Sequence, residues 1–328
     1  MVVALGGLGG APVSEKIQRR HTLRVTRGPR KGLTIVCAEA RSNGKSVAAK
    51  PPYNVVITGS TKGVGLSLAK EFLEAGDNVL ISSRQDDKVW GSVAELGRSF
   101  GMERVKGMPC NVAKPFEVRN LADFAVNELG SVDLWINNAG SNAYSYKVLS
   151  EFSDADLTEV IETNLLGTML CCREAIRIMR DQPSDGHIFN MEGAGSNGRP
   201  TPRFAAYGAT KRAITHFNES LSAELKLQNI NNVGIHMLQP GMCTTDLLMS
   251  GAKEANGKFF INCLAEDPEI PAKFLVPKVR NIPEESRPLL GMGGIRPQAL
   301  EYLTPTKAYN QIFRRLAFGE RKDRWVEE

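Results

Sequence analysis

Asn54-Val-Val-Ile-Thr-Gly-Ser-Thr-Lys-Gly-Val-Gly65 is the stretch that decides the fold. A short β-branched run leads into three glycines, Gly59, Gly63 and Gly65, and a helical pattern follows over residues 66–75. Glycines between a strand and a helix permit a tight turn. They also let backbone N–H groups and the helix N-terminus approach a pyrophosphate. The stretch therefore predicts the first strand, turn and helix of a dinucleotide-binding unit.

The same alternation of strand and helix continues along the chain. Strands are expected at residues 54–57, 78–82, 105–109, 133–136, 187–190 and 233–238, and helices at 66–75, 90–100, 117–129, 157–179 and 209–226. Strands that alternate with helices pair in parallel, with the ligand site at their carboxyl ends. The sequence predicts an α/β fold, a single doubly wound parallel sheet of the Rossmann type with helices on both faces.

Basic residues are concentrated at the start of the chain. Residues 1–50 hold ten of the 41 Lys and Arg but two of the 36 acidic residues, which leaves 31 basic and 34 acidic residues beyond. The body thus lacks the basic surface that nucleic-acid binding requires. The Arg-rich, acid-poor head is typical of an organelle transit peptide, and a retained basic arm is the alternative.

Three regions are expected. Residues 1–50 would be a transit peptide and disordered head, residues 51–250 a dinucleotide-binding catalytic domain, and residues 251–328 a substrate-site and C-terminal extension packed on the same domain. The six cysteines and four histidines show no spacing typical of disulfide frameworks or metal ligands. No apolar run is long enough to span a bilayer. These features predict no metal, a reducing compartment, and a soluble or peripheral protein.

The second strand ends in Ser83-Arg84, where a fold that prefers NAD usually presents an acid to the ribose. Arg84, together with Lys62 in the glycine loop, suits a 2′-phosphate instead, because a guanidinium grips phosphate oxygens bidentately. The predicted cofactor is NADPH, with NADH as the alternative.

Tyr207 and Lys211 lie at i and i+4 on one face of a predicted helix. A phenol that titrates near ~10 is a poor acid at pH 7, but a neighbouring ammonium lowers its pKa. Carbonyl reduction needs a proton on oxygen as hydride reaches carbon, and such a phenol can supply it. Asn164 is a further candidate, because asparagine is unusual in the middle of a helix.

In this order, T-G-x-x-x-G-x-G, N-N-A-G at 137–140, Asn164, Y-x-x-x-K and Pro240-Gly241 resemble the short-chain dehydrogenase/reductase family over about residues 53–250. The resemblance implies that Tyr207 is the general acid, that Lys211 lowers its pKa and holds the nicotinamide ribose, and that Asn164 supports a relay water. It also implies that residues 242–245 contact the nicotinamide amide. The cofactor-binding residues expected are Gly59, Thr61, Lys62, Gly63, Val64, Gly65, Arg84, Asn111, Val112, Asn138, Ala139, Gly140, Tyr207, Lys211, Pro240, Gly241 and Thr245.

The chain departs from the family at two positions. The residue expected to contact adenine is commonly Asp in the family and is Asn111 here, whose carbonyl can still accept from the adenine amine. The serine that positions the substrate oxygen usually lies thirteen residues before the tyrosine, where this chain has Ala194. Ser196, in a glycine-rich loop, is nominated for that role.

Within the family, the loop at 190–211 and the segments 244–251 and 258–262 resemble the plant chlorophyll(ide) b reductases. This resemblance implies reduction of the 7-formyl group of chlorophyll b or chlorophyllide b to a hydroxymethyl group, the first step of chlorophyll b degradation. It places the chain in the chloroplast, on the stromal side and peripheral to the thylakoid membrane. A membrane-anchored partner reductase and a homo-oligomer are both compatible with the sequence.

A flat chlorin needs a wide apolar site, and the expected lining residues are Leu247, Leu248, Met249, Phe259, Phe260, Ile261, Phe274 and Leu275. The basic tail at 314–324 is expected to contact the membrane surface. Three alternatives stand beside this hypothesis: a serine hydrolase using Ser196, Glu219 and His236, a non-catalytic dinucleotide-binding subunit, and a reductase of an acyl or steroid ketone.

Overall fold

The computed structural model describes residues 23–25, 35–37, 47–250, 255–287 and 293–328, so the predicted transit peptide lies almost wholly outside the described residues. Two short strands, β1 (Leu23–Val25) and β2 (Ile35–Cys37), pair antiparallel within the first unit of the chain, Met1–Lys45. The second compact unit, Ser46–Glu328, holds the other elements.

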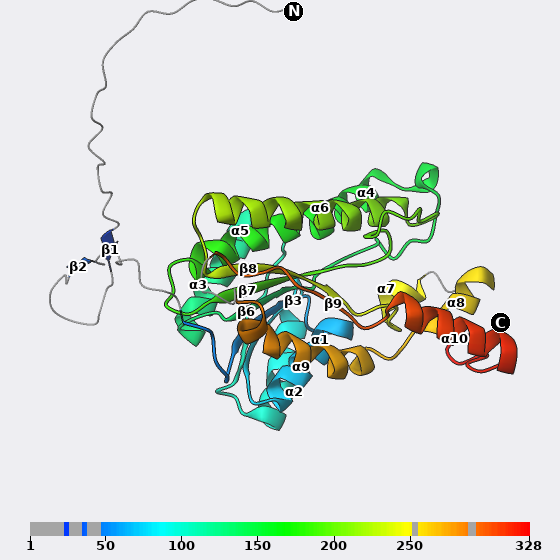
Figure 1. Cartoon of the computed structure of the whole chain (residues 1–328), viewed down its shortest axis with the longest axis horizontal. Coiled ribbons are helices and arrows are strands. Elements are labelled where there is room, and N and C mark those ends of the chain that lie inside the picture. Colours follow the sequence, from blue (N-terminus) through cyan, green and yellow to red (C-terminus); the bar gives the residue numbers. More distant parts are fainter. Residues whose placement is uncertain (1–22, 26–34, 38–46, 251–254, 288–292) are drawn as a thin grey trace, which may run out of the picture. The chain divides into compact units, whose positions relative to one another are not determined.

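The second unit is built on a seven-stranded sheet in the order β5-β4-β3-β6-β7-β8-β9, in which every neighbouring pair is parallel (Figure 1). The strands are β3 (Asn54–Thr58), β4 (Asn78–Ser82), β5 (Val105–Gly107), β6 (Leu134–Asn137), β7 (Gly186–Met191), β8 (Val233–Gln239) and β9 (Ala299–Glu301). All six predicted strands are present, and β9 adds an edge strand that the sequence analysis missed. The doubly wound parallel sheet is confirmed.

Helices cover both faces of the sheet (Figure 1). One apolar cluster joins it to α1 (Gly63–Glu74), α2 (Asp86–Phe100) and α9 (Glu269–Glu285), and another to α3 (Pro115–Leu129), α5 (Gly167–Met179) and α6 (Ala205–Leu227). Successive strand side chains alternate between the two clusters: Val55 and Ile57 face the first, and Val56 faces the second. This follows from the two-residue period of a strand and explains why the strands read as continuous apolar runs.

The helix expected at residues 157–179 is interrupted by a π-helical turn. It consists of α4 (Asp154–Ile161), the turn η2 (Glu162–Leu166) and α5, and the turn carries Asn164. Single π-helical turns are frequent at functional sites. The shorter elements are η1 (Leu149–Glu151), α7 (Asp246–Met249), α8 (Ala255–Leu264) and α10 (Pro305–Phe318).

Two histidines are part of the core. His187 of β7 and His236 of β8 are fully buried, with 3.1 Å between Nδ1 of the first and Nε2 of the second. Burial lowers the pKa of His187 to about 3, so the pair is neutral at physiological pH. Among the described residues, no group of three or more His, Cys, Asp or Glu side chains could hold a metal ion. No helix in the described ranges is long and apolar enough to cross a membrane.

Helix α10 exposes apolar side chains, while its neighbouring arginines are paired. Tyr309, Phe313, Leu316 and Phe318 are each more than 60% exposed. Ion pairs join Arg314 to Glu320, Arg315 to Glu328, and Arg321 and Arg324 to Glu266. Three acids thus pair with four of the arginines, which reduces the free positive charge of this tail. Contact of the basic tail with the membrane surface stays a prediction.

Candidate active site

A cavity of about 1070 Å³ opens at the carboxyl ends of the parallel strands, where the fold predicts a ligand site. It exceeds the volume usual for a pocket that holds one drug-sized molecule. Three predicted site residues, Gly65, Asn164 and Ser196, do not line it. The predicted residues that do are Gly59, Thr61, Lys62, Gly63, Val64, Arg84, Asn111, Val112, Asn138, Ala139, Gly140, Tyr207, Lys211, Pro240, Gly241 and Thr245.

The glycine loop packs backbone to backbone against the turn after β6. Gly59 has φ +63°, and a Cβ there would lie 2.8 Å from Cα of Ala139. A Cβ on Gly65 would lie 2.4 Å from the carbonyl oxygen of Gly59. Asn138 closes the contact, because its Nδ2 donates to the carbonyl oxygens of Thr58 (2.9 Å) and Gly59 (2.8 Å). The packed loop holds the start of α1 at the cavity, a geometry suited to a pyrophosphate.

The two cations predicted to bind a 2′-phosphate both line the cavity, and each is paired with an acid. Lys62 Nζ lies 2.6 Å from Asp246 Oδ2, and Arg84 Nη1 lies 3.1 Å from Glu159 Oε1. The side chains of Lys62 and Arg84 are 55% and 53% exposed. Exposed pairs of this kind contribute about 0–1 kcal/mol, so a dianionic phosphate can replace the acids as the partner.

Asn111 lines the cavity at the end of β5, beside Val112. Its side-chain oxygen accepts from the backbone N–H of Ala113 at 3.1 Å. A carbonyl oxygen has two lone pairs, so a second bond, from an adenine amine, is compatible with this geometry.

Asn164 joins the loop after β6 to α6. Its Oδ1 accepts from the backbone N–H of Ser141 (2.7 Å), while Nδ2 donates to the Ser141 carbonyl (2.8 Å) and to Oγ1 of Thr210 (3.1 Å). The side chain is fully buried and both of its amide protons are used. Its buried amide therefore fixes the spacing between the cofactor loop and the helix that carries Tyr207, and the relay water remains a prediction.

Tyr207 and Lys211 lie one turn apart on α6, at the exit of β7. Lys211 Nζ donates to the carbonyl oxygen of Met191 at 2.9 Å and lies 5.6 Å from the centre of the Tyr207 ring. Gly193 provides the room for the phenol, since a Cβ at that position would lie 2.5 Å from the Tyr207 hydroxyl oxygen. The strand exit thus anchors the ammonium and leaves space for the phenol.

Burial shifts the pKa of Tyr207 and the pKa of Lys211 in the directions that favour their neutral forms. It raises the pKa of Tyr207 to about 12, and it lowers the pKa of Lys211 to about 8, against the attraction of Glu192, which raises it. The expected lowering of the phenol pKa by Lys211 is not seen, because burial dominates. At pH 7 the phenol keeps its proton, and an amine with a pKa near 8 is roughly nine-tenths protonated. A protonated phenol is the form needed to donate during a reduction.

Ser196 does not reach the cavity. Gly195, at φ +97°, turns the chain so that Ser196 Oγ accepts from the backbone N–H of Gly193 at 3.0 Å. The residues that line the cavity here are Glu192, Gly193 and Ala194. The nomination of Ser196 as the residue that positions the substrate oxygen is therefore not supported, since its hydroxyl is used to shape the loop.

Glu192 is a cavity-lining residue that the sequence analysis missed. Burial raises its pKa, Glu301 raises it further and Lys211 lowers it. The sequence could have indicated this residue, because Glu192 is an acid directly after β7, the strand that precedes the helix with Tyr207.

The expected chlorin-binding residues separate into two groups. Leu247 and Leu248 line the cavity, and Ile261 and Leu275 are buried in the body of the protein. The other four, Met249, Phe259, Phe260 and Phe274, do not line the cavity either. The expectation that these residues line the substrate site therefore holds for Leu247 and Leu248 and is corrected for the other six. Phe204 and Tyr144 supply aromatic lining that the sequence analysis did not predict.

The sequence model of the family described as short chain dehydrogenase matches residues 53–256. The chain belongs to this family of oxidoreductases. It is similar to "Chlorophyll(ide) b reductase NOL, chloroplastic" of Oryza sativa subsp. japonica, with 55% identity over 89% of this chain and 84% of that protein. The protein of the same description from Arabidopsis thaliana is 53% identical over 91% of this chain and 85% of its own length.

A solved structure supports the fold. The alcohol dehydrogenase from the archaeon Thermococcus sibiricus, complexed with 5-hydroxy-NADP, superposes with a TM-score of 0.60 at 22% identity, and the match covers 75% of this chain and 94% of that chain.

Replacing Tyr207 with Phe should lower turnover by about 10²- to 10⁴-fold, because it removes only the hydroxyl that is expected to donate the proton, while the ring still fills its buried place. Cofactor affinity should stay within a few-fold of wild type. A turnover assay with a carbonyl substrate and a fluorescence titration with NADPH measure the two quantities.

Tyr309→Phe on the exposed face of α10 is the matched control, and it should leave both quantities unchanged. Near wild-type turnover by Tyr207→Phe at pH 7 would assign the proton donor elsewhere.

Proposed function

We propose that this chain uses NADPH to reduce the 7-formyl group of chlorophyll b or chlorophyllide b to a hydroxymethyl group, the reaction that begins chlorophyll b breakdown in the chloroplast. The observation that carries the proposal is the identity of 53–55% to two chloroplastic chlorophyll(ide) b reductases over about nine-tenths of the chain. This similarity extends beyond the region matched by the family as a whole.

The arrangement of the cavity suits an aldehyde. Bound NADPH supplies hydride to a carbonyl carbon. Tyr207, protonated because burial raises its pKa to about 12, donates a proton to the carbonyl oxygen. The charge left on the phenol is compensated by the Lys211 ammonium, which the Met191 carbonyl holds in place. An alcohol forms with neither a metal nor a covalent bond to the protein.

Substrate choice is attributed to the apolar lining between the turn after β6 and α7. Tyr144, Phe204, Leu247 and Leu248 offer flat or branched apolar surface around the same cavity as Tyr207. A macrocycle with one reactive formyl group at its edge fits a site that is apolar except for a few polar groups that set orientation.

Incubation of the full chain with chlorophyllide b and NADPH tests the function. The absorption of the formyl-bearing pigment should give way to that of the hydroxymethyl product, which chromatography identifies. Unchanged chlorophyllide b together with rapid reduction of an acyl or steroid ketone would favour the alternative substrate class. Cofactor binding without turnover of any carbonyl would favour a non-catalytic subunit.

The preference for NADPH over NADH is attributed to Arg84 and Lys62. Replacing Arg84 with Ala should weaken NADPH binding about tenfold, the loss expected for one charge-assisted contact of roughly 1.4 kcal/mol, and should leave NADH binding nearly unchanged. Titration with each cofactor measures both constants.

Arg98→Ala, an exposed arginine at the far end of α2 that bonds only to its own helix, is the matched control. Equal losses for the two cofactors with Arg84→Ala would contradict a role for this residue at the 2′-phosphate.

We further propose that the chain acts on the stromal side, peripheral to the thylakoid membrane, and that α10 makes the contact. Figure 1 shows α7, α8 and α10 at the end of the sheet where β8 leads into α7, which is the end that carries the cavity. The exposed set Tyr309, Phe313, Leu316 and Phe318 offers apolar anchors there. Because the neighbouring arginines are paired, we expect insertion of apolar side chains to contribute more to membrane binding than charge attraction does.

Replacing Phe313 and Leu316 together with Ser should lower sedimentation of the protein with vesicles of galactolipid and phosphatidylglycerol by several-fold, and added salt should change wild-type binding little. Leu227→Ser, which removes an 82% exposed leucine at the end of α6, is the control. Binding abolished by salt would indicate charge instead, and absence of binding to lipid alone would favour a membrane-anchored partner reductase.

A further inference from the structure

The segment after β8 lines the cavity and is held by a short parallel pairing. Met242, Cys243 and Thr244 all line the cavity, and Cys243 forms an isolated β-bridge with Glu266. The backbone N–H of Glu266 donates to the Met242 carbonyl, and the N–H of Thr244 donates to the Glu266 carbonyl, both at 3.0 Å. The backbone position of Glu266 therefore sets the position of this wall.

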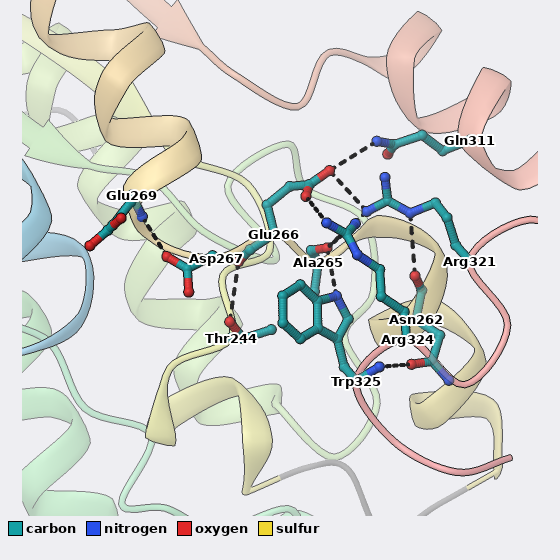
Figure 2. A network of polar contacts seen from close by, with 10 residues as sticks. All are labelled: Thr244, Asn262, Ala265, Glu266, Asp267, Glu269, Gln311, Arg321, Arg324 and Trp325. Atoms are coloured by element: carbon teal, nitrogen blue, oxygen red, sulfur yellow. Dashed lines mark hydrogen bonds and ion pairs between the residues drawn. The ribbon is translucent and has the colours of Figure 1, made fainter.

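The Glu266 side chain is itself held by the C-terminal tail (Figure 2). Its carboxylate is buried, 2.9 Å from Arg321 Nη2 and 2.8 Å from Arg324 Nη2, and Gln311 of α10 donates to it at 3.5 Å. A buried carboxylate without a partner is strongly destabilising. The ion pairs with Arg321 and Arg324 therefore stabilise the buried position of the Glu266 side chain.

Hydrogen bonds to Asn262 and to the Ala265 carbonyl also hold the C-terminal tail next to Glu266. Asn262 of α8, fully buried, accepts from the backbone N–H of Trp325 (2.7 Å) and Val326 (3.1 Å), and it donates to the Val326 carbonyl (2.7 Å). Three bonds converge on the Ala265 carbonyl: from Trp325 Nε1 at 3.0 Å, Arg321 Nη2 at 2.9 Å and Arg324 Nη1 at 3.4 Å. The tail is thus bound to two residues, Asn262 and Ala265, that shortly precede Glu266 in the chain.

None of Arg321, Arg324 and Trp325 lines the cavity. Their effect on a bound molecule must pass through Glu266 and its pairing with residues 242–244. Arg314 of α10 forms an exposed ion pair of 2.8 Å with Glu320, just after the helix, and this pair does not include Glu266.

We propose that Glu266 is a positioning residue for the nicotinamide half of the cofactor, and that the tail residues Arg321 and Arg324 set its place. The proposal rests on the cofactor site described above and does not depend on the pigment. It predicts that weakening this contact loosens the nicotinamide end of the site, while the part of the cavity expected to hold the adenine half, at Arg84 and Asn111, keeps its affinity.

The test compares two probes with the full chain carrying Glu266→Gln, which keeps the shape and removes the charge. Affinity for NADPH should fall about three- to thirtyfold, the size usual for an indirect coupling between contacting elements. Affinity for 2′,5′-ADP, which carries the adenine half and the 2′-phosphate but no nicotinamide, should stay within twofold. Arg324→Gln should repeat this pattern and Arg324→Lys should largely restore affinity. Arg314→Gln should change neither probe.

Equal weakening of NADPH and 2′,5′-ADP would overturn the proposal, because it would indicate a general loss of structure. Unchanged affinity for both probes would also overturn it. If Glu266→Gln does not fold, Arg324→Gln, whose side chain is partly exposed, decides by the same two titrations. Since no pigment is used, failure here is distinct from failure of the proposed reduction.

Discussion

The hydrogen bond from Lys211 to the carbonyl oxygen of Met191 is the contact on which the site depends. It ties the start of α6 to the exit of β7 at 2.9 Å and gives a buried ammonium its partner. Without this partner, the cost of burying the charge would favour rotation of the side chain toward water. The bond also fixes Tyr207 one turn earlier on the same helix, where the missing Cβ of Gly193 leaves room for its hydroxyl.

Close backbone approach gives the cofactor half of the site its shape. The turn of Gly59 against Ala139 and the bonds from Asn138 bring the exits of β3 and β6 together. Asn164 then links the β6 loop to α6, and so joins the two halves. Because most of these contacts involve a main-chain group, a change at one of them moves a strand exit, whereas the exposed pairs of Lys62 and Arg84 can exchange partners at little cost.

The sequence predicted those features of the fold and the site that depend on residues close together in the chain. β-Branched runs located six strands, the glycine spacing located the loop, and the i, i+4 spacing placed Tyr207 and Lys211 together at the cavity. Strand β9 was missed because it is three residues long, at the edge, and exposes Ala299 and Glu301. The direction of the Ser196 side chain could not be predicted, because it depends on the left-handed conformation of Gly195. The place of Leu275 in the core was missed because an apolar pattern looks the same in a core and in a ligand site. The pairing of Glu266 with arginines 55 and more residues away has no local signal.

Tyr207 is expected to be protonated in its buried place and to give that proton to the substrate oxygen. Carbon-13 NMR of the protein labelled at tyrosine Cζ tests it most directly, with Tyr207→Phe used to assign the resonance. Because burial raises the pKa of Tyr207 to about 12, the signal should keep the position of a neutral phenol from pH 6 through at least about pH 10, beyond the value near 10 of an ordinary tyrosine. A phenolate signal at pH 7 would contradict the account.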